Sequence, residues 1–116
     1  MALHLDPKAF AARAAAAQLL RTLANERRLM ILCQLIEGER TVGALQPLVG
    51  ISQSALSQHL GVLRADGLVT TRRAGQAIHY RIADADAARV LEVLASIYCP
   101  PEEEIKHDDD ADNAFA

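Results

Sequence analysis

The sequence predicts a mainly α-helical domain that carries one small β-hairpin. Apolar residues recur every three to four positions in five segments, which is the period of one buried helical face. Residues 68–82 instead alternate apolar and polar side chains around a Gly-containing turn at residues 74–76, a pattern typical of a hairpin with one face in water. The chain has 116 residues, so a single domain is expected, and 51% of them are hydrophobic, which suffices for one core.

The segment from Ile51 to Leu68 is the centre of this prediction. Ser52 can cap the N-terminus of a helix with its hydroxyl, and Gly67 can end that helix in a left-handed conformation. Leu68 then follows at the position where such an ending makes an apolar contact. Between the two ends, one buried stripe is predicted, formed by Leu56, Leu60 and Leu63.

The other face of this helix is polar and carries almost no charge. It consists of Gln53, Ser54, Ser57, Gln58 and Arg64. Amide and hydroxyl groups donate and accept hydrogen bonds at base edges in the major groove of DNA. A merely solvated surface is the alternative, and this helix alone does not separate the two interpretations.

The neighbouring segments favour the interpretation as a DNA-reading helix. Residues 41–50 predict a shorter helix capped by Thr41, and a tight turn through Gly50 and Ile51 joins it to the polar helix, which is a helix-turn-helix pattern. The hairpin that follows carries a polar and basic cluster of Arg72, Arg73, Gln76, His79 and Arg81. A helix-turn-helix followed by a basic hairpin predicts a winged helix.

Two more helices are predicted before this pair. Asp6 and Pro7 indicate the start of the first, which runs to about Leu23 and is rich in alanine. Asn25 caps the second, over residues 26–38. The apolar stripe predicted for the second helix consists of Leu29, Leu32, Cys33 and Ile36.

A last helix follows the hairpin, capped by Asp84 or Asp86 and stopped by Pro100 and Pro101. Its aligned apolar positions are Ala87, Val90, Leu91, Leu94 and Ile97. The first and last helices are too apolar for a small monomer, so we expect residues 1–100 to form a homodimer through them. Such a dimer would present two reading helices to half-sites about 34 Å apart.

Charge is distributed unevenly along the chain. Residues 101–116 hold seven acidic residues and one lysine, a net charge of −6, and little apolar surface, so they are expected to form a disordered acidic tail. The whole chain carries −3, which leaves +3 on residues 1–100. Local charge, and not the total, determines the field at a binding surface, so a basic DNA-binding face remains compatible with the composition.

Composition also excludes other classes of function. Aromatic residues make up only 3%, which argues against stacking platforms for single-stranded nucleic acid. No apolar run is long enough to span a membrane and no signal peptide is recognisable, so a cytoplasmic protein without membrane contact is expected. In a reducing compartment the two cysteines argue against a structural disulfide.

Taken together, the motifs resemble the ArsR/SmtB family of winged-helix repressors over residues 18–99. The resemblance is carried by residues 23–29 (LANERRL), residues 52–60 (SQSALSQHL), Leu63-Arg64, Gly67-Leu68-Val69 and Tyr80. It implies a homodimeric repressor that binds double-stranded operator DNA and is released by an inducer. The candidate DNA-binding residues are then Ser52, Gln53, Ser54, Ser57, Gln58, His59, Arg64, Arg72, Arg73, Gln76 and His79. Of these, His59 equally suits a role in helix packing.

Metal sensing, which is common in the resembled family, is not expected here. Residues 41–50 lack the Cys-x-Cys pair of one metal-binding type, and the last helix lacks the histidines of another. The four histidines, at positions 4, 59, 79 and 107, are too scattered to share a metal ion. We therefore predict no metal and no cofactor. Pro47 is a smaller departure and should shorten or kink the third helix.

The cysteines are similar to those of a sulfide- and persulfide-responsive branch that includes the BigR and SqrR repressors. Cys33 lies on the second helix, and Cys99 ends the last one within the motif Ile97-Tyr98-Cys99. The resemblance implies that the two thiols react with persulfide to form an intramolecular polysulfide or disulfide, which releases DNA. Alternatively, Cys33 only fills space on an apolar stripe.

Other classes of function remain as alternatives. A dithiol oxidoreductase would require a low-pKa cysteine, usually in a Cys-x-x-Cys motif at a helix N-terminus, which this chain lacks, so no enzyme is expected. A winged helix that binds only protein is disfavoured by the basic hairpin. Within the class of repressors, response to arsenite or to general oxidants, or no response at all with purely structural cysteines, stays open.

Overall fold

The computed structural model describes residues 13–98 and contains five helices and three strands within that range. In chain order these are α1 (Arg13–Leu23), α2 (Glu26–Ile36), β1 (Arg40–Thr41), α3 (Val42–Val49), α4 (Gln53–Ala65), β2 (Val69–Ala74), β3 (Ala77–Ile82) and α5 (Ala85–Tyr98). The predicted class, mainly helical with a small hairpin, is confirmed. The predicted helix start at Asp6, the proline stop, Cys99 and the acidic tail lie outside the described residues.

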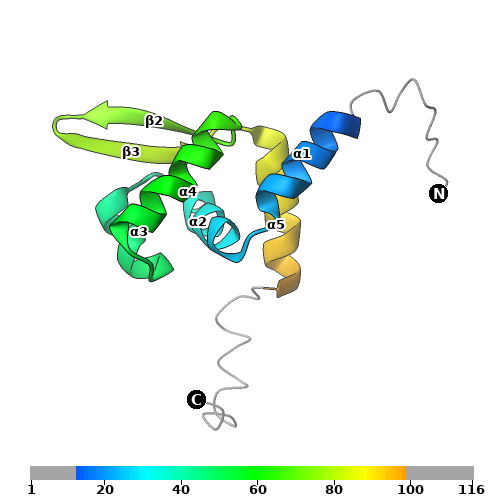
Figure 1. Cartoon of the computed structure of the whole chain (residues 1–116), viewed down its shortest axis with the longest axis horizontal. Helices are drawn as coiled ribbons and strands as arrows, with labels where there is room; N and C mark the ends of the chain where they lie inside the picture. Colours follow the sequence, from blue (N-terminus) through cyan, green and yellow to red (C-terminus); the bar gives the residue numbers. More distant parts are fainter. Residues whose placement is uncertain (1–12, 99–116) are drawn as a thin grey trace, which may run out of the picture.

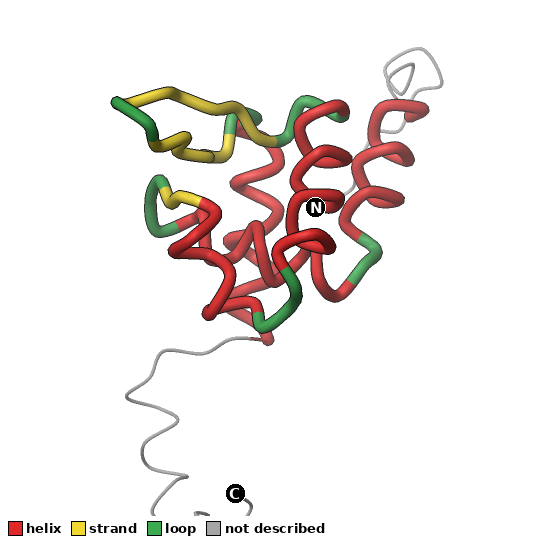
Figure 2. The backbone as a smooth tube through the Cα atoms, turned by 60° about the vertical axis from the view of Figure 1, so that its left-hand side comes forward, coloured by secondary structure: helices red, strands yellow, loops and turns green. Residues whose placement is uncertain are grey.

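The helices form one body from which the β2–β3 hairpin projects (Figure 1). In that view the hairpin extends to the left, whereas α1 and α5 lie toward the opposite side of the helical body. Figure 2 shows the same body from another direction, with the hairpin again standing clear of the helices. The predicted wing and the predicted dimerisation helices therefore occupy different sides of the molecule.

The sheet has one strand that the sequence did not predict. β1 pairs antiparallel with β3, with Arg40 opposite Tyr80 and Thr41 opposite His79, so the strand order is β1-β3-β2. Because β1 has only two residues, it is too short to show an alternating pattern. β1 connects the base of the hairpin to the segment between α2 and α3, so the hairpin is not an isolated arm.

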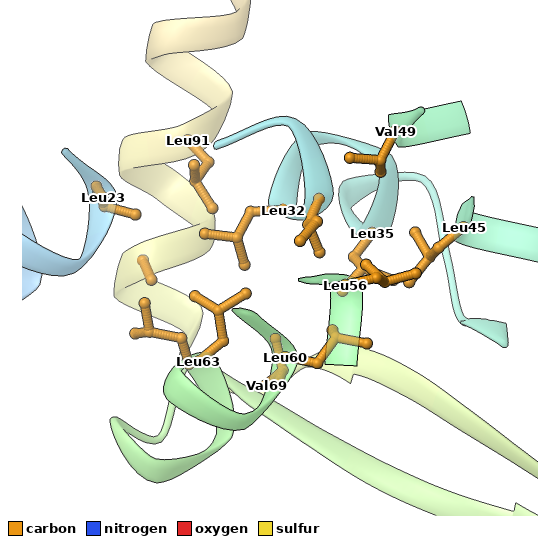
Figure 3. Close-up of a cluster of buried hydrophobic side chains, with 13 residues drawn as sticks. Leu23, Leu32, Leu35, Leu45, Val49, Leu56, Leu60, Leu63, Val69 and Leu91 are labelled. Atoms are coloured by element: carbon orange, nitrogen blue, oxygen red, sulfur yellow. The ribbon is translucent and has the colours of Figure 1, made fainter. Parts of the chain in front are cut away.

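The core is built mainly from leucines of α2, α3, α4 and α5 (Figure 3). Leu56, Leu60 and Leu63 of α4 are buried, as their spacing predicts. On α2 the prediction was partly wrong. The buried residues of α2 are Ile31, Leu32 and Leu35, whereas Leu29, Cys33 and Ile36 are half-buried. Leu32 of the predicted stripe therefore lies in the core, whereas the other three members of the stripe lie at its edge.

Predicted capping residues begin four of the helices. The side chains of Asn25, Thr41 and Ser52 accept hydrogen bonds from the backbone amides of Arg28, Ala44 and Ala55, at 3.0, 3.1 and 3.1 Å. For α5, the cap is Asp84 and not Asp86: its Oδ1 accepts from the amides of Asp86 and Ala87 at 2.9 and 3.1 Å. At Pro47 the prediction was a shortened or kinked helix; α3 has only eight residues and continues through Pro47 to Val49.

The end of α4 is a complete Schellman motif. Gly67 has a φ of +77°, and the Leu68 amide donates to the Leu63 carbonyl at 2.9 Å while the Gly67 amide donates to Arg64 at 3.0 Å. Leu68 is buried, which supplies the apolar contact that accompanies this motif. The length and direction of α4, the helix that carries the candidate reading face, are thus fixed at both ends by local sequence.

Candidate nucleic-acid interface

The first part of the candidate interface is the outer face of α4. Gln53, Ser54, Ser57 and Gln58 are all exposed, as is Arg64 in the last turn. Ser52 is also exposed, and its hydroxyl oxygen accepts from Ala55 while its proton remains available to a phosphate or base. Leu56, Leu60 and Leu63 anchor the opposite side of the helix in the core, so the amide and hydroxyl groups project outward from a rigid support.

His59 differs from the other α4 candidates. It is half-buried, whereas Gln58 beside it is exposed. A side chain with both packing and solvent contact fits either of the two roles that the sequence left open for it. The structure therefore does not group His59 with the fully exposed reading residues.

The second part of the interface is the β2–β3 hairpin. In its register Arg72 lies opposite His79, and Thr70 opposite Arg81. Directly opposite residues share a face of a sheet, so Arg72, His79 and Arg81 lie on one face.

The other two candidates of the hairpin lie elsewhere. Arg73 lies opposite Ile78 on the other face. Gln76 is exposed at the tip beside Gly75, whose φ of +65° suits the first position of a tight hairpin turn. The sequence predicted that these polar and basic residues gather on the hairpin, but it did not show which face of the hairpin each one occupies.

The alternation predicted for β3 holds only at the base of the hairpin. Tyr80 and Ile82 pack against the core, whereas Ile78 is exposed. Ile78 lies near the tip, where the hairpin extends past the helical body and no core is available to cover it (Figure 1).

Sequence patterns did not identify Glu39, an acidic residue that directly precedes β1 and lies beside the basic hairpin. Its carboxylate accepts three hydrogen bonds from Arg72, at 3.1 and 3.2 Å from Nε and 2.7 Å from Nη2, and lies 3.9 Å from Nε of Arg81. Hydrogen bonds from Arg72, followed by the positive charges of Arg72, His79 and Arg81, hold the pKa of the Glu39 carboxyl below its ordinary value. Glu39 and Arg72 are 33 positions apart, so no local pattern in the sequence signals this contact.

The candidate sensor residue Cys33 lies on α2 beside α5. It is half-buried at the edge of a pocket of about 190 Å³ whose other lining residues are apolar or aromatic: Leu29, Leu91, Leu94, Ala95 and Tyr98. Tyr98 is the last residue of α5 and the last that the structure describes. Cys99, the other predicted sensor residue, follows it directly in the sequence and lies outside the described residues.

A polar contact connects α1 to the end of α4. Thr22, the buried polar residue of α1, donates its hydroxyl proton to the carboxylate of Asp66, and Gln18 donates to the same carboxylate at 3.3 Å. From α2, Arg28 donates to the backbone carbonyls of Thr22 and Arg21, at 2.7 and 3.4 Å. The C-terminal end of α1 is therefore joined to both α2 and α4 by side-chain hydrogen bonds.

Within residues 13–98, no group of three or more His, Cys, Asp or Glu side chains is arranged to hold a metal ion. None of the helices in the described part of the chain is long and apolar enough to cross a membrane.

A helix-turn-helix with an exposed amide-rich second helix, beside a basic hairpin, defines a winged-helix DNA-binding protein. The chain belongs to the arsR family of bacterial regulatory proteins, whose family model matches residues 25–71. It is 51% identical over 87 residues to the Biofilm growth-associated repressor (BigR) of Agrobacterium fabrum, covering 75% of this chain and 74% of the relative. The resemblance to the ArsR family and to BigR-type repressors is thus confirmed.

Solved structures agree with this assignment. The reduced form of HlyU from Vibrio cholerae, which is named a transcriptional activator, superposes with a TM-score of 0.75 at 44% identity, covering 79% of this chain and 97% of that one. A homodimeric winged helix-turn-helix domain from Mycobacterium bovis superposes with a TM-score of 0.68 at 37% identity. The superposition covers 92% of this chain and 95% of that domain. The predicted winged helix-turn-helix fold is confirmed.

Proposed function

We propose that this chain is a homodimeric transcriptional repressor that binds operator DNA and is released when Cys33 and Cys99 react with persulfide sulfur. The observation that carries the DNA-binding part is the exposed amide and hydroxyl face of α4 beside the basic hairpin. In this proposal, α4 enters the major groove, and the hairpin contacts the phosphate backbone of flanking DNA. Because the relative from Agrobacterium fabrum is named a repressor, we expect this chain to lower transcription when it binds DNA.

The proposed dimer interface is formed by α1 and α5. Large apolar side chains on these helices are exposed: Leu20 by 62%, Val93 by 58%, Ile97 by 61% and Tyr98 by 75%. Exposed apolar side chains gathered on two helices are typical of surfaces that are covered by a partner. A symmetric dimer through this side would leave both α4 helices and both hairpins available to DNA.

The proposed sensor rests on the position of Cys33. Its thiol borders the apolar pocket between α2 and α5, and Tyr98 lines the same pocket. Consecutive Cα atoms are about 3.8 Å apart, so Cys99 is one residue from a side chain that already shares the pocket with Cys33. A bond between the two cysteines would connect α2 to the end of α5, which is also a proposed dimerisation helix, and would thereby change the spacing of the two α4 helices.

The proposed chemistry is thiol–persulfide exchange. One cysteine thiolate attacks the outer sulfur of a persulfide R–S–SH, and R–S⁻ leaves with the bonding electron pair. The resulting Cys–S–SH is then attacked at its inner sulfur by the second thiolate, which forms a disulfide and releases HS⁻. If both cysteines are first converted to persulfides, the same attack gives a trisulfide and HS⁻. In each case the sulfane sulfur that leaves is reduced and the two thiols are oxidised.

This proposal is tested on a DNA duplex selected from a random pool by the reduced wild-type protein. Treatment with glutathione persulfide is expected to weaken binding at least tenfold, and intact mass should show Cys33 and Cys99 bridged within one subunit. Cys33→Ser and Cys99→Ser should each bind the duplex when reduced but no longer respond. If both variants still release DNA after treatment, the cysteines are packing residues and the sensor assignment is wrong.

Parallel samples distinguish the alternatives left open by the sequence. Hydrogen peroxide in place of persulfide tests for a general oxidant sensor, and arsenite tests for a thiol-binding metalloid sensor. A protein that binds the duplex but responds to none of the three is a constitutive regulator. A promoter fused to a reporter gene, with and without the protein, shows whether binding represses or activates.

A further inference from the structure

Two arginines on one face of the hairpin share a single carboxylate. Arg72, His79 and Arg81 lie on that face, and Glu39 contacts Arg72 through three hydrogen bonds and Arg81 at 3.9 Å. Glu39 directly precedes β1, whereas Arg72 belongs to β2, and β3 lies between these two strands. The Arg72 side chain must therefore lie across β3 to reach Glu39, and it does not project freely from the hairpin.

The contact occupies the part of Arg72 that would bind DNA. Glu39 accepts from both Nε and Nη2, which is the edge of a guanidinium that binds a carboxylate or a phosphate through two parallel hydrogen bonds. A backbone phosphate can use this edge only after the carboxylate has left it. Glu39 is ionised at neutral pH, as an exposed carboxylic acid ordinarily is, so its carboxylate competes with a phosphate for this edge.

Arg73 provides an internal comparison. It is the adjacent residue in the sequence but lies on the opposite face of the hairpin. Among residues 13–98, its Nε donates only to the backbone carbonyl of Gly75, at 3.4 Å. A long neutral contact of this kind is easily exchanged for a charged one. Of the two neighbouring arginines, one is thus held by a carboxylate and the other is available to an anion.

We propose that Glu39 is an internal competitor for DNA phosphate, which holds Arg72 and so limits how many phosphates the hairpin neutralises. Phosphate contacts carry little sequence information, so Glu39 lowers the affinity for all duplexes and leaves the preference for one sequence nearly unchanged. In a repressor that must leave its operator on a signal, such a restraint keeps the non-specific part of binding weak. This inference rests on the proposed contact between the hairpin and DNA.

The test uses the full chain and a random-sequence 30-base-pair duplex at several salt concentrations. Glu39→Gln is expected to raise the affinity about two- to fivefold, the range set by the strength of exposed ion pairs. The slope of log affinity against log salt concentration should steepen by about 0.9, which corresponds to one additional phosphate contact. Unfolding curves should show that the variant is as well folded as the wild type.

Glu37→Gln is the matched control. It removes the same charge two residues away, but Glu37 pairs with Arg40 at 3.0 Å and does not contact the basic face of the hairpin. Glu37→Gln should change the salt slope little. In an Arg72→Gln background, Glu39→Gln should have no more effect than Glu37→Gln, because the residue that Glu39 restrains is absent.

Each other outcome has a defined meaning. Equal effects of Glu39→Gln and Glu37→Gln would show that Glu39 acts only through long-range charge, and the inference would be wrong. A loss of affinity in Glu39→Gln would show instead that Glu39 holds Arg72 in its DNA-binding position. If the wild type binds no duplex in a salt-dependent way, the proposed function fails, and this inference fails with it.

Discussion

Gly67 and Gly61 are two glycines at the same helix, α4, with different backbone requirements. Gly67 follows the helix with a φ of +77°, whereas Gly61 lies within it, and an added Cβ would meet no atom within 4 Å at either position. Gly67→Ala should destabilise the protein by about 1–2 kcal/mol, because a left-handed backbone is strained for any residue with a Cβ. Urea unfolding measures this change directly.

Gly61→Ala is the control for that experiment. In the interior of a helix, alanine is favoured over glycine by about 0.8–1.0 kcal/mol, so this variant should be more stable than the wild type. The opposite signs of the two substitutions would show that conformation, and not the added methyl group, decides the effect. Equal stability of Gly67→Ala and wild type would contradict the assigned end of α4.

The outer face of α4, which is proposed to read DNA, leads to a prediction about affinity for the selected duplex. Gln53→Ala and Ser57→Ala should each weaken binding to the selected duplex by about 1–3 kcal/mol, which is the usual cost of losing a good base contact. Both side chains are exposed, so the melting temperature should change little. Unchanged affinity in both α4 variants would exclude this helix as the reading element.

At this scale, sequence predicted the residues whose contacts are local. Asn25, Thr41 and Ser52 each bond an amide three residues ahead, so capping chemistry alone identifies them. The contact between Glu39 and Arg72 depends on how three strands are ordered, and nothing in the neighbouring residues signals it. For the same reason the sequence favoured Arg72 and Arg73 equally as DNA-binding residues, although their surroundings differ.

Between elements, the hydrogen bond from Thr22 to Asp66 joins a proposed dimerisation helix, α1, to the proposed reading helix, α4. Thr22→Val keeps the shape of the side chain but removes the donor, and should cost about 1 kcal/mol in the free energy of unfolding. It should also weaken binding to a duplex with two half-sites more than binding to one half-site, because α4 loses part of its fixed position relative to α1.

Asp66→Asn is the control for the contact with Thr22, since its side-chain oxygen can still accept from that hydroxyl. Fluorescence anisotropy with matched one- and two-site duplexes provides the comparison. If Thr22→Val weakens both duplexes equally, the contact stabilises the fold without positioning α4 in the dimer.

The helices were predictable as elements because each carries an apolar period, and α2, α3 and α4 also have recognisable ends. The exceptions follow from the same reasoning. β1 is too short to have a period. Apolar residues surround α2 on more than one side, so helical spacing allows the predicted stripe of Leu29, Leu32, Cys33 and Ile36, of which only Leu32 is fully buried. Only the packing of α2 against α3, α4 and α5 shows that Ile31 and Leu35 are at its centre.

For the whole molecule, the exposed apolar side chains of α1 and α5 predict self-association. Leu20→Glu and Val93→Glu should each shift the protein toward monomer, because a charge would be buried without a partner in the proposed interface. Sedimentation equilibrium at several concentrations measures the shift. Leu48→Glu is the control, since Leu48 is a similarly exposed apolar residue on α3. A monomeric wild type would contradict the proposed interface.

The sequence also predicted the general character of the assembled site but not its geometry. DNA binding by a dimer is predicted from sequence patterns alone: an amide-rich helix, a basic hairpin and apolar terminal helices. The faces of the hairpin, the pocket beside Cys33 and the contact between α1 and α4 depend on packing between distant segments. These features therefore required the folded structure.

The strand order of the sheet has a further consequence for solubility. β2 lies at the outer edge of the sheet and pairs only with β3 among the described residues, so its second row of backbone amides and carbonyls has no strand beside it. Such edges can pair with the edge of another molecule and start aggregation, and natural proteins protect them with charged side chains. Arg73, which no carboxylate holds among the described residues, places a positive charge on this edge strand. The same residue that is proposed to meet DNA would repel a second copy of the hairpin and keep the unbound protein dispersed.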